Sequence, residues 1–249
     1  MTALTLALRE KPVRDIDLSG LTPDRLAGLA LSAIDAIRLP GGQQVGNLFD
    51  IAAGDAQHLI IRNASERLTH VGAGMRSGTL TVEGNCGAYA GQALRGGKLI
   101  VTGNAGDFAG AATAGDRQGM RGGIIAIQGN AGDRAGERMR RGLILVGGDA
   151  GAYCGANMLA GTIFVAGEVG TMPGFALRRG TLLLGRKPQE ISATFQDSGV
   201  HRLLFLTLLE KQLRREDPSF LRFLPVDRKV RRYCGDLACG GLGEMLVFA

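Results

Sequence analysis

The hydrophobic positions of this chain recur as short apolar runs, each preceded by a glycine. Six glycines lie directly before a four-residue run, at Gly78, Gly97, Gly123, Gly142, Gly161 and Gly180. The steps between them are 19, 26, 19, 19 and 19 residues. In every run the second and fourth residues are Leu, Ile or Val, from Leu80 and Val82 to Leu182 and Leu184. Because alternate residues of a strand share a face, we predict six short strands with one buried face.

The segments between the runs repeat as well. A G-x-x-G-x-x-x-G pattern follows five of the runs, beginning at Gly84, Gly103, Gly129, Gly148 and Gly167. Gly, Asn and Asp tolerate left-handed backbone conformations, so these segments are predicted to form tight corners. Three residues before each starting glycine is a further apolar position, which predicts a second inward ladder of Met75, Leu94, Met120, Met139, Met158 and Leu177.

The period itself decides between fold classes. A step of 19 residues has no room for the helix of about 10–15 residues that joins parallel strands in α/β folds. A conventional β-sandwich would leave the regular glycine spacing unexplained. We therefore predict an all-β fold, a single-stranded β-solenoid of about six regular 19-residue coils in residues 56–187.

Residues 1–55 and 188–249 are predicted to cap the two ends of the solenoid. The first cap should hold a strand at TLALRE and a helix from Pro23 to Ile37 with Thr22 as its N-cap, and Leu59 with Ile61 should form an early core pair. The second should hold a helix from Val200 to Arg215, capped by Asp197 or Ser198. This helix has an apolar stripe, which consists of Leu203, Leu206, Leu209 and Leu213. We expect the stripe to pack on the last coil, together with an apolar patch at 220–224 and the closing strand GEMLVFA.

Composition narrows the class further. The chain has 40 glycines among 249 residues but only 7 prolines, and 45% hydrophobic residues, which excludes collagen-like and disordered chains. Four cysteines are too few for a disulfide-stapled fold. The N-terminal segment lacks the pattern of a signal peptide, and no apolar stretch reaches the roughly 20 residues that span a bilayer. We expect a cytoplasmic protein with reduced thiols and no contact with a membrane.

Residues that could carry catalysis are scattered. His58, His70 and His201 have no metal-ligand spacing, and Cys234 and Cys239 are too far apart for a C-x-x-C site. The acidic residues of greatest interest lie at corners, where they suit turn formation as well as acid catalysis: Asp107, Asp133 and Asp149. We predict no catalytic residue and no metal site in this chain.

The clearest feature outside the core is basic. Two places before the starting glycines are Arg76, Arg95, Arg121, Arg140, Leu159 and Arg178, so five arginines should stack along one edge. The net charge of +6 agrees with an anionic partner, and Lys211–Arg232 is also rich in basic residues. Arginine stems that cover apolar surface and aid solubility are the alternative. Because Trp is absent and other aromatic residues are few, nucleic acid is not the expected partner.

The 26-residue step contains seven extra residues, 111–117. Insertions in solenoids form loops on one face, which is often the binding face. On this basis a partner contact is predicted for the insertion, although without further support a neutral surface loop is the favoured explanation. The residues are Ala111, Thr113, Gly115, Asp116 and Arg117.

These motifs together resemble a known family. The glycine-punctuated coils are similar to the C-terminal β-helix domain of glutamate synthase and to the C subunit of formylmethanofuran dehydrogenase. The inserted segment FAGAATAGDRQGMRGG and the closing RRYCGDLACGGLGEMLVF resemble the second family more specifically, above all the C subunit of the bacterial formyltransferase/hydrolase complex of methylotrophs. The resemblance covers nearly the whole chain.

The resemblance implies a right-handed β-helix that serves as a structural subunit. In that family the complex transfers a formyl group from formyl-tetrahydromethanopterin to a furan-type carrier with a polyglutamate tail and then releases formate. It also implies partners that carry the chemistry: an amidohydrolase-like subunit with the metal, a formyltransferase and one further subunit. The tail gives the arginine edge a candidate ligand, which is a hypothesis from residue chemistry and not a family motif.

Three alternatives stay open from the sequence. One is a subunit of a true formylmethanofuran dehydrogenase, with a redox subunit in the complex. Another is a polyanion-binding β-helix module that acts without partners. The third is a polysaccharide-active β-helix enzyme, which would need an acidic groove where the sequence predicts a basic edge.

Overall fold

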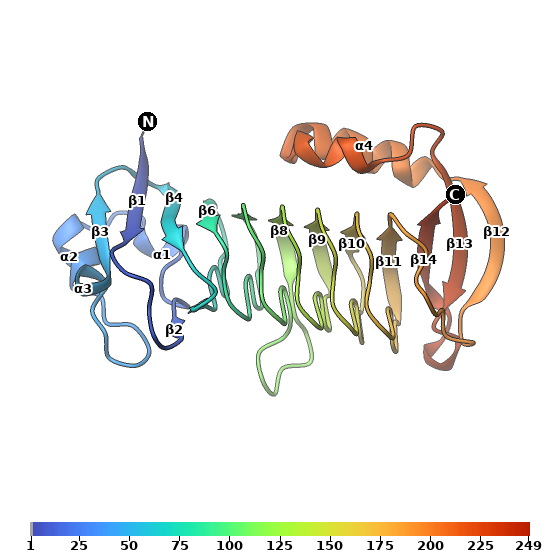
Figure 1. Ribbon diagram of the computed structural model, residues 1–249, viewed down its shortest axis with the longest axis horizontal. Helices are drawn as coiled ribbons and strands as arrows, with labels where there is room; N and C mark the ends of the chain where they lie inside the picture. The colour runs from blue at the N-terminus through green and yellow to red at the C-terminus, as the bar shows by residue number, and fades with distance from the viewer. Residues whose placement is uncertain (1) are drawn as a thin grey trace.

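The computed structural model describes residues 2–249, which form mostly β-structure (Figure 1). The strands are β1 (Ala3–Leu8), β2 (Ile16–Asp17), β3 (Phe49–Ala52), β4 (Asp55–Ala64), β5 (Leu68–Thr69), β6 (Thr79–Gly84), β7 (Lys98–Val101), β8 (Arg121–Ile127), β9 (Arg141–Val146), β10 (Thr162–Val165), β11 (Arg179–Leu184), β12 (Gln196–Arg202), β13 (Lys229–Gly235) and β14 (Leu242–Phe248). The helices are α1 (Pro23–Leu26), α2 (Leu31–Asp35), α3 (Val45–Leu48) and α4 (Leu204–Glu216), with 3-10 helices η1 (Pro218–Phe223) and η2 (Leu237–Cys239). None of these helices is long and apolar enough to cross a bilayer.

Twelve of the described strands form one long sheet, in the order β12-β13-β14-β11-β10-β9-β8-β7-β6-β4-β1-β3. Neighbours along the stretch from β1 to β14 are parallel. The pairs at the two ends are antiparallel: β1 with β3, β12 with β13, and β13 with β14. A second line of parallel bridges joins the corners of successive coils: Cys86, Ala105, Ala131, Ala150 and Val169. This arrangement is that of a β-helix or solenoid, as the glycine period predicts.

The registers confirm the predicted core. Leu80 is opposite Leu99 in the next strand, and the same column continues through Ile125, Ile144, Ile163 and Leu182. All six side chains are fully buried, and so is the predicted Met and Leu ladder from Met75 to Leu177. Leu59 and Ile61 of β4 are fully buried as well, which confirms the early core pair.

The repeated glycines are required by close approach of the backbones. Gly97 has a φ of 74°, and a Cβ placed there would lie 2.6 Å from the carbonyl oxygen of Gly78 in the preceding coil. Gly123 has a φ of 81° and would place a Cβ 2.6 Å from the carbonyl oxygen of Gly97. Another residue type would strain the backbone and push successive coils apart.

The predicted N-terminal helix was wrong in its extent. Residues 23–37 contain two short helices, α1 and α2, separated at Gly28, which has a φ of 80° that ends the first helix. Thr22 takes the N-cap position of α1 but its side chain makes no capping hydrogen bond. The predicted strand at TLALRE is confirmed as β1, and β1 and β3 extend the same sheet beyond β4.

The C-terminal helix begins four residues later than predicted. Residues 196–202 form strand β12 because they pair with β13, so α4 starts after Leu203 and neither Asp197 nor Ser198 caps it. The stripe of Leu206, Leu209 and Leu213 is buried as predicted. The closing strand is confirmed as β14, which pairs with β11 and covers the last coil.

The helix itself does not cover that end. It lies along the outer side of the sheet, over the strands of the solenoid (Figure 1). There α4 and Phe220 of η1 form a second apolar cluster with outward residues of β8 to β11: Ile124, Ala126, Leu143, Leu145, Phe164 and Leu183. These strands are therefore buried on both faces, which their nearly continuous apolar sequences favour.

Candidate functional site: the arginine edge and the insertion

The arginine ladder is built by the backbone of the solenoid. The N–H of Arg95 donates to the carbonyl oxygen of Met75 at 2.9 Å, and the N–H of Arg121 donates to that of Leu94 at 2.7 Å. Arg140 and Arg178 repeat the same bond to Met120 and Met158. Consecutive ladder residues therefore belong to adjacent coils, about 4.8 Å apart, with Leu159 as the one apolar member.

The insertion leaves this ladder unbroken. The N–H of Met120 donates to the carbonyl oxygen of Gly110 at 2.9 Å, which closes the base of the loop. Figure 1 shows the segment projecting from the solenoid at β8. The extra residues thus form a loop outside the coil. Arg121 therefore lies in the coil next to that of Arg95, as it would if the step were 19 residues.

Three of the five predicted arginines meet the insertion in one hollow. Arg76, Arg95 and Arg121 line a space of about 510 Å³ together with Thr113 and Asp116 of the insertion. Asp24 and Arg25, next to each other in α1, complete its wall. We call this space the arginine hollow.

The other two predicted arginines lie outside it. Arg140 donates through Nη1 to Oε1 of Gln118 at 3.1 Å, so it contacts the end of the inserted segment. Arg178 is exposed two coils further along.

The ladder arginines form no ion pairs in the described chain, although Asp24 and Asp116 line the same hollow as three of them. Among residues 2–249, no carboxylate oxygen lies within 4.0 Å of a side-chain nitrogen in any of the five. The Nε of Arg121 is buried and has no hydrogen-bond partner in the same range. Asp24 accepts a hydrogen bond at 3.3 Å from the backbone of Arg76, not from its guanidinium. Guanidinium groups without partners favour an external anion as their ligand.

The insertion is tied down at two points. Gln92 donates through Nε2 to the carbonyl oxygen of Ala112 at 3.3 Å, and Arg138 donates through Nη1 to that of Asp116 at 2.9 Å. The exposed tip is residues 113–117, turning at Gly115 with a φ of 85°. Ala111, which we expected to face a partner, is instead 1% exposed because it still follows the path of the coil.

A second feature beside the insertion escaped the sequence-based predictions. The rings of His70 and Tyr89 stack with centroids 4.7 Å apart, and those of Tyr89 and Phe108 stack at 5.0 Å. These three residues are separated by 19 residues each, which was the available signal. They line a hollow of about 500 Å³ whose other wall includes Thr113 and Gly115 of the insertion. We call this space the aromatic hollow.

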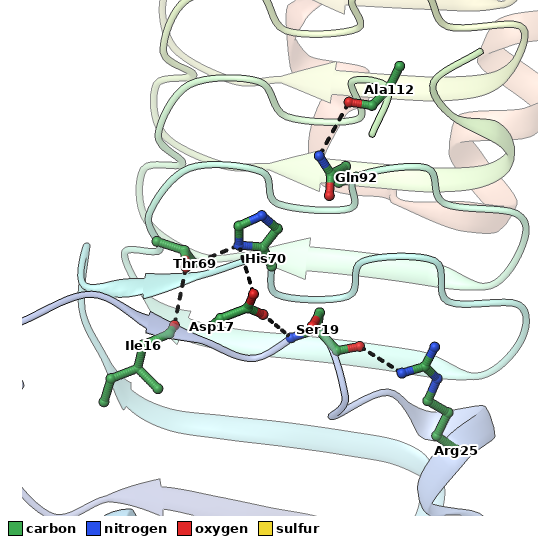
Figure 2. A network of polar contacts seen from close by, with 8 residues as sticks. All are labelled: Ile16, Asp17, Ser19, Arg25, Thr69, His70, Gln92 and Ala112. Atoms are coloured by element: carbon green, nitrogen blue, oxygen red, sulfur yellow. Dashed lines mark hydrogen bonds and ion pairs between the residues drawn. The ribbon is translucent and has the colours of Figure 1, made fainter. Parts of the chain in front are cut away.

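The N-terminal segment fixes both hollows from one side. Strand β2 pairs with β5, and Figure 2 shows Asp17 reaching toward His70, whose Nδ1 is 3.7 Å from Oδ2 of Asp17. Asp17 also accepts from the backbone N–H of Ser19 at 2.7 Å, and Arg25 donates to the carbonyl oxygen of Ser19 at 3.1 Å. This chain of contacts links the end of the aromatic stack to an arginine of the arginine hollow.

The corner carboxylates have a structural task. Oδ1 of Asp107 accepts from the backbone N–H of Asp133 in the next coil at 2.8 Å, and Oδ1 of Asp133 accepts from that of Ala152 at 2.8 Å. Asn85, Asn104 and Asn130 form a parallel series, which Asp149 continues by accepting from the backbone N–H of Glu168. These side chains hold successive corners together, as turn-forming residues do.

The histidines and cysteines are dispersed in the structure as in the sequence. His58 contacts Asp55, and His201 contacts the carbonyl oxygen of Ser198. No group of three or more His, Cys, Asp or Glu side chains in the described chain is arranged to hold a metal ion. All four cysteines are free, and burial raises the pKa of Cys86 and of Cys154 to about 12, so both thiols stay protonated.

The fold and the site together define a class of protein: a β-solenoid that has arginines without ion pairs along one edge, beside a projecting loop. The GXGXG motif family model matches residues 68–206, which is more than half of the chain. Over 86 residues the chain is 37% identical to the Fhc C subunit of the formyltransferase/hydrolase complex of Methylorubrum extorquens. That match spans 33% of this chain and 32% of the curated relative's own length.

A solved structure extends the likeness to the full length. One chain in the crystal structure of the formyltransferase/hydrolase complex (FhcABCD) from Methylorubrum extorquens, in complex with methylofuran, shares 36% identity at a TM-score of 0.84. The match covers 98% of this chain and 99% of that one. This protein therefore belongs to the GXGXG motif family and, within it, to the group of Fhc C subunits.

Proposed function

We propose that this chain is a non-catalytic structural subunit of a formyltransferase/hydrolase complex in one-carbon metabolism. The observation that carries the proposal is the likeness over 98% of the chain to a chain of such a complex. The corner carboxylates bind backbone N–H groups of the solenoid, which gives the acidic residues most suited to catalysis a structural role. The complex would transfer formyl from formyl-tetrahydromethanopterin to a furan-type carrier and release formate, on subunits other than this one.

The arginine edge is proposed to hold the polyglutamate tail of that carrier. Its five members are Arg76, Arg95, Arg121, Arg140 and Arg178, and the first three converge with the insertion in the arginine hollow. Because these guanidinium groups have no carboxylate partner among the described residues, a tail would supply the missing anions without breaking existing ion pairs. Of the insertion, Thr113 and Asp116 would border the tail, while Arg117 and Gly115, which also lines the aromatic hollow, would contact a partner subunit.

The proposed partners are an amidohydrolase-like subunit that carries the metal, a formyltransferase and a further subunit. A complex with an additional redox subunit, as in a true formylmethanofuran dehydrogenase, is distinguished by which chains accompany this one. We further propose that the solenoid is a right-handed coil of about six regular turns, since strand–crossover–strand connections are right-handed in roughly 98% of cases. We expect it to work in the cytoplasm.

Co-purification tests the subunit role. The tagged full-length chain should bring down the amidohydrolase-like and formyltransferase subunits from its native cells, identified by mass spectrometry. Recovery of the chain alone as a monomer would contradict the proposal. Additional recovery of a redox subunit with a pterin cofactor would identify the dehydrogenase type of complex instead.

Direct binding tests the arginine edge. Isothermal titration of the full chain with hexaglutamate at low ionic strength should show binding that falls about tenfold or more in the double variant Arg95→Gln/Arg121→Gln, because hydrogen bonds to charged groups contribute about 1.5–3 kcal/mol each. The control variant Arg62→Gln/Arg186→Gln removes the same charge from arginines that are ion-paired with Glu83 and Glu168. If both double variants bound hexaglutamate with equal affinity, binding would depend only on the net charge of the protein and not on the arginine edge.

A further inference from the structure

The aromatic hollow has the dimensions and lining of a binding site for a planar ring. Its volume of about 500 Å³ lies within the range of small-molecule sites, which is about 300–1,000 Å³. One wall is formed by His70, Tyr89 and Phe108, each of them only partly buried. The facing wall, residues 112–115, has small side chains that leave the space open.

The aromatic stack is interrupted at this hollow. Phe108 stacks on Tyr89 on one side, and the residue at the same repeat position in the next coil is Arg134, not a ring. The guanidinium of Arg134 lies over the ring of Tyr153, 4.9 Å from its centroid, and bonds to Glu137 at 3.3 Å. The insertion is made at this break, so the rings end where the loop begins.

The charged groups around the aromatic hollow are already satisfied. Glu137 is paired with Arg134, and Arg138 donates to the carbonyl oxygen of Asp116. The arginine hollow differs, because its three ladder guanidinium groups have no carboxylate partner in the described chain. The aromatic hollow therefore suits an uncharged ring better than a second carboxylate.

The two hollows are neighbours. Gln92 and Thr113 line both of them, and the bond from Gln92 to Ala112 marks the base of the insertion between them (Figure 2). A molecule that lay along the arginines could thus continue past Thr113 and reach the rings. We propose that the aromatic hollow binds a planar aromatic group attached to the polycarboxylate in the arginine hollow. The proposal rests on the proposed tail-binding function and adds a ring subsite to it.

Ring contacts of this kind have a measurable size. An aromatic pair at centroid distances of 4.5–7 Å strengthens binding beyond its buried area by about two- to twelvefold. The full chain should therefore bind hexaglutamate with an N-terminal benzoyl group several times more tightly than hexaglutamate with an acetyl group. Both peptides present the same carboxylates, so the difference isolates the ring.

Variants locate the gain. Tyr89→Asn and Phe108→Asn remove rings at backbone positions with φ of 66° and 63°, which Asn tolerates. Each should abolish the benzoyl advantage and leave binding of the acetyl peptide unchanged. Tyr153→Asn is the matched control, because Tyr153 has the same repeat position and a φ of 58° but does not line the hollow.

The outcomes separate the two proposals. Loss of the advantage in the Tyr89 and Phe108 variants, with Tyr153→Asn behaving like the wild type, supports the ring subsite. An advantage that is absent from the wild type, or that survives both variants, overturns the subsite while arginine-dependent binding of the acetyl peptide keeps the proposed function. Failure of both peptides to bind overturns the tail-binding function, and the subsite with it.

Discussion

The chain has two basic regions, and they differ in what their cations do. Along the solenoid edge the guanidinium groups have no carboxylate partner among residues 2–249. In the C-terminal region several basic side chains are paired: Arg214 and Arg228 with Glu210, Arg231 with Asp197, and Arg232 with Glu244. The comparison teaches that a count of charges does not locate a binding surface, whereas the state of pairing distinguishes a structural cation from an available one.

The largest expected effect comes from undoing the packing of the C-terminal region. Phe220 is fully buried and packs against Phe164 of the solenoid, with ring centroids 6.4 Å apart. Phe220→Ala should lower the free energy of unfolding by about 3–5 kcal/mol, because it leaves a cavity between η1 and the sheet. Urea unfolding followed by circular dichroism measures this.

The arginine edge supplies the contrast to that variant. Arg95→Gln should change the free energy of unfolding by no more than about 0.5 kcal/mol, because Arg95 is exposed and surface substitutions away from special features rarely do more. A comparable loss of stability in both variants would contradict the distinction between the two regions.

An intermediate effect is expected from pH. The hydrogen bond from Arg214, with the nearby charge of Arg228, lowers the pKa of Glu210 below its ordinary value. The pairing therefore stabilises the folded state fully above the unfolded pKa of about 4.3, and this stabilisation is lost as pH falls through the lower folded pKa. Glu210→Gln should melt below the wild type at pH 7, and the gap should close in strongly acidic buffer.

Differential scanning fluorimetry across pH measures that gap. A constant difference between the two melting temperatures down to pH 2 would show that Glu210 acts through packing and not through its charge. Asp197, whose pKa is lowered by the backbone N–H of Gly199 and by Arg231, should behave in the same direction.

The smallest effect concerns which thiols are reachable. Cys86 and Cys154 are buried in the solenoid with pKa raised to about 12, whereas Cys234 and Cys239 are partly exposed. Iodoacetamide at pH 8 should modify the C-terminal pair in the native protein and the solenoid pair only after unfolding, since the thiolate is the reactive form. Peptide mass spectrometry reads both sets in one sample. Early labelling of Cys86 would show that the solenoid corners open more easily than the C-terminal cap.

The regular part of the fold could be predicted from the sequence because each residue contacts the residue at the same repeat position in the next coil. Each coil packs on the next at a fixed offset, so Leu80 above Leu99 and Arg76 beside Arg95 follow from counting. The division into caps and solenoid at residues 55 and 187 stays a prediction, and the single sheet runs through all three parts.

The C-terminal helix shows where counting fails. The helix starts late because residues 196–202 pair with β13 as a strand. Neither of these two segments belongs to the 19-residue repeat, so the repeat does not predict their pairing. Its place over the flank of β8 to β11 had a readable signal in the outward apolar residues, such as Leu145 and Phe164. The aromatic stack was likewise readable, but His70 lies in the irregular coil before the first regular glycine and so falls outside the repeat.

The regular spacing of the arginines from Arg76 to Arg140 has a consequence for any extended polymer of carboxylates. Side chains on one side of an extended chain recur about every 6.8 Å, whereas the arginines recur about every 4.8 Å. Because the two spacings differ, carboxylates and arginines come into register only about once for every two carboxylates and three arginines. No single alignment is then much better than its neighbours, so a bound polymer could shift along the edge in short steps without leaving it.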